Sequence, residues 1–193
     1  MINKKALLLC PMKTATTTIT MVLVEHNVSF VSLQQSRAIS HSLPLRFVQE
    51  LGDDIFTQTF VILFVRNPYD RVVSYYEFQN KRNRKFDLPE IPDFETFIKN
   101  DFVNTPDHTL MSHYLTYQDR PIVNFVGRFE NLIDDIHQIL HILAVKDIQA
   151  IPHLQKREVD YIPYQEYYTT ELQDIVYETM CQDFQIFNYP HKL

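Results

Sequence analysis

Two short polar segments carry the side chains best suited to binding an anion. The first, residues 11–18, contains Lys13 and threonines at positions 14, 16, 17 and 18, just before a predicted helix. A helix N-terminus presents unpaired N–H groups and about half a positive charge. Lys13 would add a full cation there, and the threonines would add hydroxyl donors. We therefore predict an anion site in this turn, with an ordinary threonine cap and a solvated lysine as the alternative.

The second segment reads Arg-Asn-Pro-Tyr-Asp-Arg-Val-Val-Ser from position 66. Asn67 suits the N-cap of a helix, Pro68 its first position and Asp70 its third. Helix initiation does not explain Arg66, which ends an apolar strand and needs an anionic partner. Asp70 could be that partner, or a phosphate could, because arginine binds phosphate bidentately. Ser74 lies on the helix face of Asp70 and could donate to the same oxygens.

Strand and helix patterns alternate along the chain, which predicts an α/β fold. The expected strands cover residues 5–10, 28–33, 60–65 and 122–126, and the expected helices cover residues 16–25, 42–51, 69–79, 130–143 and 171–183. We predict a three-layer, mostly parallel sheet flanked by helices, in a single domain over residues 1–193. Ligands of such sheets bind at the carboxyl ends of the strands, where both polar segments begin.

Composition excludes several functions. The net charge of −6 over 193 residues argues against binding nucleic acid. No apolar run is long enough to span a membrane, and two cysteines are too few for a disulfide scaffold. We expect a cytoplasmic protein. The two glycines exclude both glycine-rich nucleotide-binding motifs, so any phosphate site must be built without them.

Two further features have a structural and a functional interpretation. His137 and His141 are spaced as metal ligands on one helix, but no third ligand is apparent, so we predict no metal. Residues 81–92 are interpreted as a surface excursion. The basic run within them, residues 81–85, is either a solvated face or a rim that attracts an anionic cofactor or acceptor.

Together the two polar segments resemble the sulfotransferase family that uses 3′-phosphoadenosine 5′-phosphosulfate (PAPS), and more closely its carbohydrate branch. In that family a Pro-Lys-Thr-Gly-Thr-Thr-like loop holds the 5′-phosphosulfate, as residues 11–17 would here. An Arg-Asn-Pro-Tyr-Asp-Arg-x-x-Ser-like stretch holds the 3′-phosphate, as residues 66–74 would. Residues 40–42, 126–132 and 168–189 also resemble the family. The resemblance implies a P-loop nucleotide-hydrolase-like sulfotransferase fold.

The resemblance also implies roles for individual residues. His41 would be the base that takes the proton of the acceptor, with His113 as the competing candidate, and Lys13 would stabilise charge on the leaving phosphate. The implied donor-binding residues are Lys13, Thr14, Ala15, Thr16, Thr17, Thr18, Arg66, Ser74, Lys156 and Arg157.

The implied function is transfer of a sulfuryl group from PAPS to a hydroxyl of a small molecule or glycan, with a carbohydrate preferred. The alternatives are a non-catalytic adenine-nucleotide-binding protein of the same fold and a nucleotide-dependent phosphotransferase. The loop departs from the family in two ways: Ala15 replaces a glycine, and Met12 separates Pro11 from Lys13. If position 15 needs a positive φ, alanine costs about 1–2 kcal/mol there.

Overall fold

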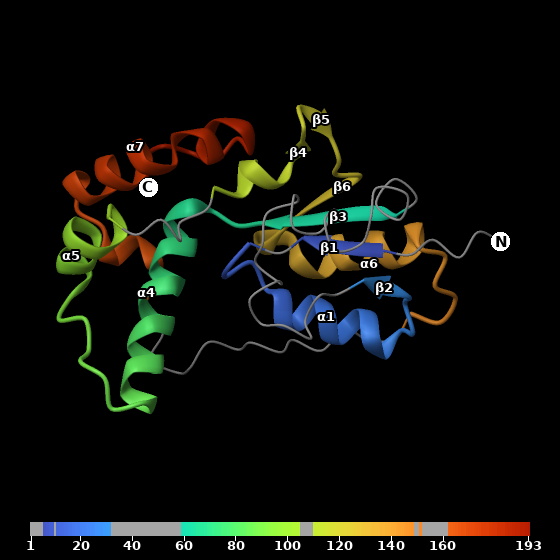
Figure 1. Cartoon of the computed structure of the whole chain (residues 1–193), viewed down its shortest axis with the longest axis horizontal. Helices are drawn as coiled ribbons and strands as arrows, with labels where there is room; N and C mark the ends of the chain where they lie inside the picture. The colour runs from blue at the N-terminus through green and yellow to red at the C-terminus, as the bar shows by residue number, and fades with distance from the viewer. Residues whose placement is uncertain (1–5, 10, 32–58, 105–109, 149–150, 152–161) are drawn as a thin grey trace. The chain divides into compact units, whose positions relative to one another are not determined.

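The computed structural model describes residues 6–9, 11–31, 59–104, 110–148, 151 and 162–193 (Figure 1). Their contacts group the chain into two compact units. Unit 1 consists of Met1–Val65 and His113–Lys156, and unit 2 of Arg66–Ser112 and Arg157–Leu193. A single domain over the whole chain stays a prediction.

Unit 1 is built on a parallel sheet with the strand order β2-β1-β3-β6. Its strands are β1 (Ala6–Leu9), β2 (Phe30–Val31), β3 (Phe60–Val65) and β6 (Phe125–Arg128). Leu9 lies opposite Leu63, so the chain leaves β1 and β3 at the same edge of the sheet. From β1 the chain continues to β2 on one side, whereas β3 continues to β6 on the other. The β1–β3 pair is therefore the switch point where open parallel sheets bind their ligands.

One face of this sheet is covered by α1 (Thr16–Glu25) and α6 (Leu132–Ile142). Alternate residues of the strands meet apolar side chains of both helices in a single buried cluster. Its fully described members are Ala6, Leu8, Ile19, Val22, Leu23, Ile62, Phe64, Ile136, Ile139 and Leu140. Leu7, Leu9 and Leu63 point to the other face and are also buried, as expected for parallel strands. A separate antiparallel ribbon joins β4 (Thr116–Tyr117) to β5 (Arg120–Pro121).

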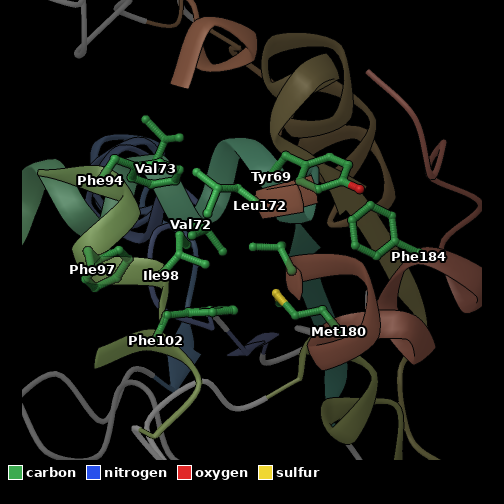
Figure 2. Close-up of a cluster of buried hydrophobic side chains, with 11 residues drawn as sticks. Tyr69, Val72, Val73, Phe94, Phe97, Ile98, Phe102, Leu172, Met180 and Phe184 are labelled. Atoms are coloured by element: carbon green, nitrogen blue, oxygen red, sulfur yellow. The ribbon is translucent and has the colours of Figure 1, made fainter. Parts of the chain in front are cut away.

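Unit 2 packs helices around an aromatic core. Its main helices are α4 (Pro68–Lys85) and α7 (Thr170–Ile186). It also contains the short α5 (Phe94–Thr96), a π-helical segment (Phe97–Phe102) and a 3-10 turn (Tyr164–Tyr167). Figure 2 shows their shared core. The buried residues are Tyr69, Val72, Val73, Phe94, Phe97, Ile98, Phe102, Leu172, Val176, Met180 and Phe184. The rings of Tyr69 and Phe184 lie 4.8 Å apart and thereby join α4 to α7.

Four helices end on a residue other than glycine in the left-handed conformation. These residues are Asn27, Asp87, Ala144 and Asn188, with φ between 52° and 59°. The following N–H bonds back to a carbonyl five residues earlier in each case, for example Val145 N to Leu140 O at 3.0 Å. Glycine usually occupies this position of a helix C-cap, but none of these four caps contains one.

The predicted fold class is confirmed: an α/β protein with a parallel sheet flanked by helices. The strand over residues 60–65 and the helix over residues 16–25 have the bounds that the patterns predicted. The helix predicted over residues 42–51 lies outside the described residues. None of the helices in the described part of the chain is long and apolar enough to cross a membrane.

Two predictions of local structure were wrong. The helix that begins at Pro68 continues to Lys85, so residues 81–85 are helical rather than part of a surface excursion. Side chains stabilise this end of the helix: Arg82 donates to Gln79 Oε1 at 3.2 Å, and the amide of Asn80 bonds to the backbone of Ile91. The fourth strand of the sheet begins at Phe125, three residues later than expected.

Candidate functional site

The turn between β1 and α1 contains two left-handed residues. Lys13 has φ 68°, and Ala15 has φ 67° and ψ 26°. Glycine adopts this conformation freely, whereas alanine pays about 1–2 kcal/mol for it. Position 15 therefore does need a positive φ, and the chain accepts the strain of an alanine to make the turn.

Thr14 closes the turn from inside. Its side chain is fully buried, and Oγ1 donates a hydrogen bond to the carbonyl of Pro11 at 2.7 Å. The carbonyl of Ala15 accepts the first helical bond from the N–H of Ile19 at 3.1 Å. Thr14 thus holds the loop in shape and directs its hydroxyl to the backbone.

The N-terminus of α1 is open to an anion. Its N-cap is Ala15, no side chain caps it, and its first turn contains no acidic residue. The ordinary threonine cap is therefore absent. The first-turn N–H groups, from Thr16 to Thr18, have no acceptor within the helix, and Thr17 is exposed. Lys13 precedes them in the same turn and is partly buried. Positive charge and free donors thus accumulate at the sheet edge where β1 ends.

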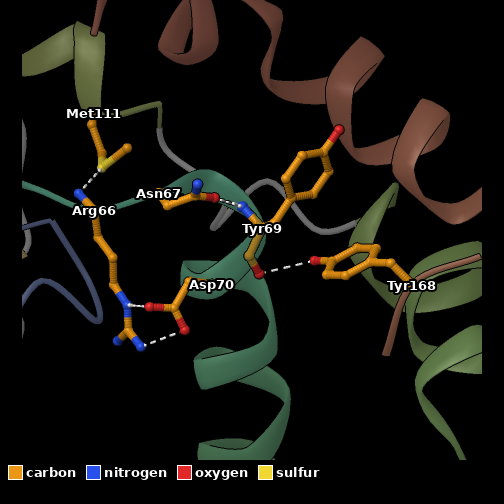
Figure 3. Close-up of polar contacts among 6 residues, drawn as sticks. All are labelled: Arg66, Asn67, Tyr69, Asp70, Met111 and Tyr168. Atoms are coloured by element: carbon orange, nitrogen blue, oxygen red, sulfur yellow. Dashed lines mark hydrogen bonds and ion pairs between the residues drawn. The ribbon is translucent and has the colours of Figure 1, made fainter. Parts of the chain in front are cut away.

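Arg66 forms a two-point ion pair at the start of unit 2. Its Nε and Nη2 donate to the two carboxylate oxygens of Asp70, each at 2.8 Å (Figure 3). Both side chains are buried, with 4% and 8% of their surface exposed. Asp70 is thus the structural partner anticipated from the sequence. A guanidinium carries five N–H donors, and the Asp70 carboxylate uses two of them.

The helix that follows Arg66 starts as its sequence predicts. Asn67 is the N-cap of α4 and accepts a bond from the N–H of Tyr69 at 2.9 Å, with Pro68 at the first helical position. Ser74 lies one turn beyond Asp70 and is partly buried. Capping by Asn67 and the proline together fix the residue at which α4 begins.

Two tyrosines brace this first turn, the buried Tyr69 and the partly buried Tyr168 (Figure 3). The hydroxyl of Tyr168 donates to the carbonyl of Tyr69 at 2.9 Å, and the hydroxyl of Tyr69 donates to the carbonyl of His191 at 2.6 Å. Burial, with smaller contributions from Asp174 and Tyr177, raises the pKa of Tyr69 to about 12. Burial also raises the pKa of Tyr168 well above its ordinary value. Both hydroxyls therefore remain donors at neutral pH.

Sequence reasoning gave no role to the buried carboxylate of Asp183. It lies on α7, is fully buried, and accepts bonds from the N–H groups of Met111 and Ser112, both at 2.8 Å. The Sδ of Met111 in turn accepts the N–H of Arg66 at 3.4 Å (Figure 3). The sequence feature that could have indicated Asp183 is its place next to Phe184, as an acidic residue among core residues of a helix.

Other predicted site residues lie elsewhere or outside the described chain. His41, Lys156 and Arg157 are outside the described residues. His113 is exposed, in the 3-10 turn Met111–Tyr114. In the described ranges, no three His, Cys, Asp or Glu side chains are grouped so that they could hold a metal.

A model of the sulfotransferase family matches residues 7–190. The chain belongs to the sulfotransferase family. The match confirms the resemblance read from the two motifs, and both the turn at residues 11–18 and the stretch at residues 66–74 lie within it. The chain is also 30% identical over 95 residues to an uncharacterized protein of Archaeoglobus fulgidus, and the match covers 47% of this chain and 72% of that protein.

Proposed function

We propose that the chain transfers a sulfuryl group from PAPS to a hydroxyl of a carbohydrate acceptor. The observation that carries the proposal is the turn before α1, in which Lys13 precedes an uncapped helix N-terminus in a chain of the sulfotransferase family. A sulfuryl donor is anionic at the bond that breaks, so its transfer needs this kind of positive, donor-rich turn.

The donor supplies an activated sulfuryl group; its S–O bond to the 5′-phosphate breaks as a new S–O bond to the acceptor oxygen forms. This displacement resembles phosphoryl transfer in its demands, which are alignment and charge stabilisation. Lys13 and the first N–H groups of α1 would stabilise the negative charge that grows on the released phosphate. The remaining contacts to the 5′-phosphosulfate of the donor are assigned, through side chain or backbone, to Thr14, Ala15, Thr16, Thr17 and Thr18.

The 3′-phosphate is assigned to Arg66 and Ser74. Arg66 is held by Asp70 at two points, so its guanidinium is ordered before a phosphate arrives, which lowers the entropy lost on binding. Lys156 and Arg157 are proposed to add positive charge to the same phosphate.

The acceptor hydroxyl must lose its proton to a base, and we assign this role to His41, with His113 as the competing candidate. The two are distinguished by replacing each with alanine and measuring sulfuryl transfer across pH. Near-normal turnover of His41→Ala together with loss in His113→Ala would reverse the assignment. The carbohydrate class of the acceptor rests on the resemblance of the two polar segments, residues 11–18 and 66–74, to the carbohydrate branch, and a screen of hydroxyl compounds with ³⁵S-labelled PAPS tests it.

The central experiment measures transfer of labelled sulfate by the wild type and by Lys13→Ala. We expect a loss of about 10²–10³ in rate, the usual effect of removing one charge-stabilising contact. Lys146→Ala is the matched control, since this exposed lysine follows α6, away from the loop. Unchanged turnover of Lys13→Ala would contradict the proposed role of the loop.

Binding separates the proposal from its alternatives. Adenosine 3′,5′-bisphosphate (PAP), the product, should bind the wild type tightly and lose affinity in Arg66→Ala. Binding of PAP without transfer to any acceptor would indicate a non-catalytic nucleotide-binding protein. Metal-dependent turnover of ATP would indicate a phosphotransferase instead.

A further inference from the structure

Asp183 is a charged group in the middle of an apolar core. It has no exposed surface, and core side chains of α7 surround it in sequence, among them Met180 and Phe184. A carboxylate in such a place is costly unless hydrogen bonds and a cation compensate it. Its retention in the core therefore needs an explanation.

Both carboxylate oxygens are used, and all their partners lie in unit 2. Oδ2 accepts the N–H of Met111, and Oδ1 accepts the N–H of Ser112, each at 2.8 Å. Oδ2 also lies 3.7 Å from Nη1 of Arg71, whose side chain is 7% exposed. One carboxylate thus fixes two consecutive backbone groups and faces a buried guanidinium.

These partners connect Asp183 to Arg66 by two routes. Met111 is fully buried, and its sulfur accepts the backbone N–H of Arg66 at 3.4 Å. Arg71 follows Asp70 in the first turn of α4, and its N–H bonds to the carbonyl of Asn67 at 2.8 Å. A shift of Asp183 would therefore disturb the backbone on both sides of the Arg66–Asp70 ion pair.

We propose that Asp183 is a positioning residue for the 3′-phosphate subsite, acting through Met111 and Arg71 on the placement of Arg66. The inference rests on the proposed function, in which Arg66 holds the 3′-phosphate of the donor. Asp183 itself does not contact the nucleotide. Its role is to keep the segment at Met111 and the first turn of α4 in register, so that the Arg66 guanidinium is preset.

The substitution Asp183→Asn tests this with two ligands that differ only in the 3′-phosphate. Asparagine keeps the shape, but it has one acceptor oxygen for two N–H groups and no charge for Arg71. We expect the affinity for PAP to fall by roughly tenfold, the effect of losing one charge-assisted hydrogen bond between a displaced Arg66 and the 3′-phosphate. Adenosine 5′-monophosphate should bind as it does to the wild type, within twofold. In turnover, KM for PAPS should rise while kcat stays within twofold.

Asp174→Asn is the matched control, because Asp174 is on the same helix, is 59% exposed and lies 3.6 Å from His191. It should change neither affinity. If Asp183→Asn does not fold, Met111→Leu replaces it: leucine keeps the volume and removes only the sulfur acceptor. That variant should lose PAP affinity severalfold and leave the monophosphate unaffected.

The outcomes are distinct. Equal losses of affinity for both nucleotides would show a general structural role and overturn the inference. An unchanged PAP affinity in a folded Asp183→Asn would also overturn it. Where that variant does not fold, an unchanged PAP affinity in Met111→Leu would do the same. If the wild type binds PAP no more tightly than adenosine 5′-monophosphate, the 3′-phosphate assignment in the proposed function fails, and the inference fails with it.

Discussion

Arg66 and Asp70 form a two-point ion pair across the first turn of α4, with both contacts at 2.8 Å and both side chains almost fully buried. Each charge is compensated mainly at short range, because little water reaches either group. A buried pair of this kind adds little net stability over apolar residues, but removing one partner leaves an uncompensated ion. The pair therefore makes the site sensitive to substitution on either side.

The substitution Asp70→Asn should lower the free energy of unfolding by about 3 kcal/mol, because the buried Arg66 loses the anionic partner that meets it at two points. Glu90→Gln is the matched control: it breaks the Arg84–Glu90 pair, also at 2.8 Å, but those side chains are 59% and 49% exposed. An exposed pair contributes about 0–1 kcal/mol. Urea unfolding of both variants measures the difference, and equal losses would refute the argument from burial.

Ala15→Gly should raise stability by about 0.5–1 kcal/mol. Glycine removes the cost of about 1–2 kcal/mol of a left-handed alanine, and part of that gain is offset by the larger entropy of the unfolded chain. Ala144→Gly is the matched control, with φ 59° at the end of α6, and should gain a similar amount. Only the change at position 15 should alter PAPS affinity; a thermal melt and a titration measure the two effects. A lower stability of both variants would contradict the claim that a left-handed alanine strains the backbone at these two positions.

Part of this structure could be predicted from local patterns. The helix start at Pro68 follows from Asn67 and the proline itself, and the strand Phe60–Val65 follows from a continuous apolar run. Arg66 was identifiable because a cation at the end of a buried strand needs an anion. These features depend only on residues close together in sequence.

The remaining features depend on backbone conformation or on distant partners. The positive φ of Ala15 cannot be read from an alanine, which normally avoids it. The role of Asp183 depends on the N–H groups of Met111 and Ser112, about 70 residues earlier in the chain. Backbone donors carry no sequence signature, so no pattern connects them to a particular carboxylate.

Gly127→Ala should lower the free energy of unfolding by about 1–3 kcal/mol, the usual cost of overpacking a core. Gly127 on β6 pairs in register with Phe64 on β3, and a Cβ there would lie 2.5 Å from Cε1 of the phenylalanine ring. The glycine is thus needed for close approach. In a chain that already carries Phe64→Leu, Gly127→Ala should lower the free energy of unfolding by less than it does in the wild type. Strict additivity of the two changes in denaturant unfolding would exclude the clash as the cause.

Tyr69 should make the stability of the chain fall at alkaline pH. Its pKa is about 12 in the folded chain, raised mainly by burial, against about 10 for an unfolded tyrosine. Below about pH 10 the group is protonated in both states, and its contribution is complete. Between about pH 10 and 12 the unfolded chain releases the proton first, so unfolding becomes more favourable as pH rises.

Tyr69→Phe should therefore flatten the decline of unfolding free energy between about pH 10 and 12, measured by urea unfolding at fixed ionic strength. Some slope should remain, because burial also raises the pKa of Tyr168. At neutral pH the variant should lose about 1 kcal/mol, since the hydroxyl of Tyr69 no longer donates to the carbonyl of His191 at 2.6 Å. The loss of stability at neutral pH and the slope at alkaline pH have separate causes. The first comes from the missing hydrogen bond to His191, and the second from ionisation of the Tyr69 hydroxyl. A variant that shows the neutral loss but keeps the wild-type slope would exclude Tyr69 as the titrating group.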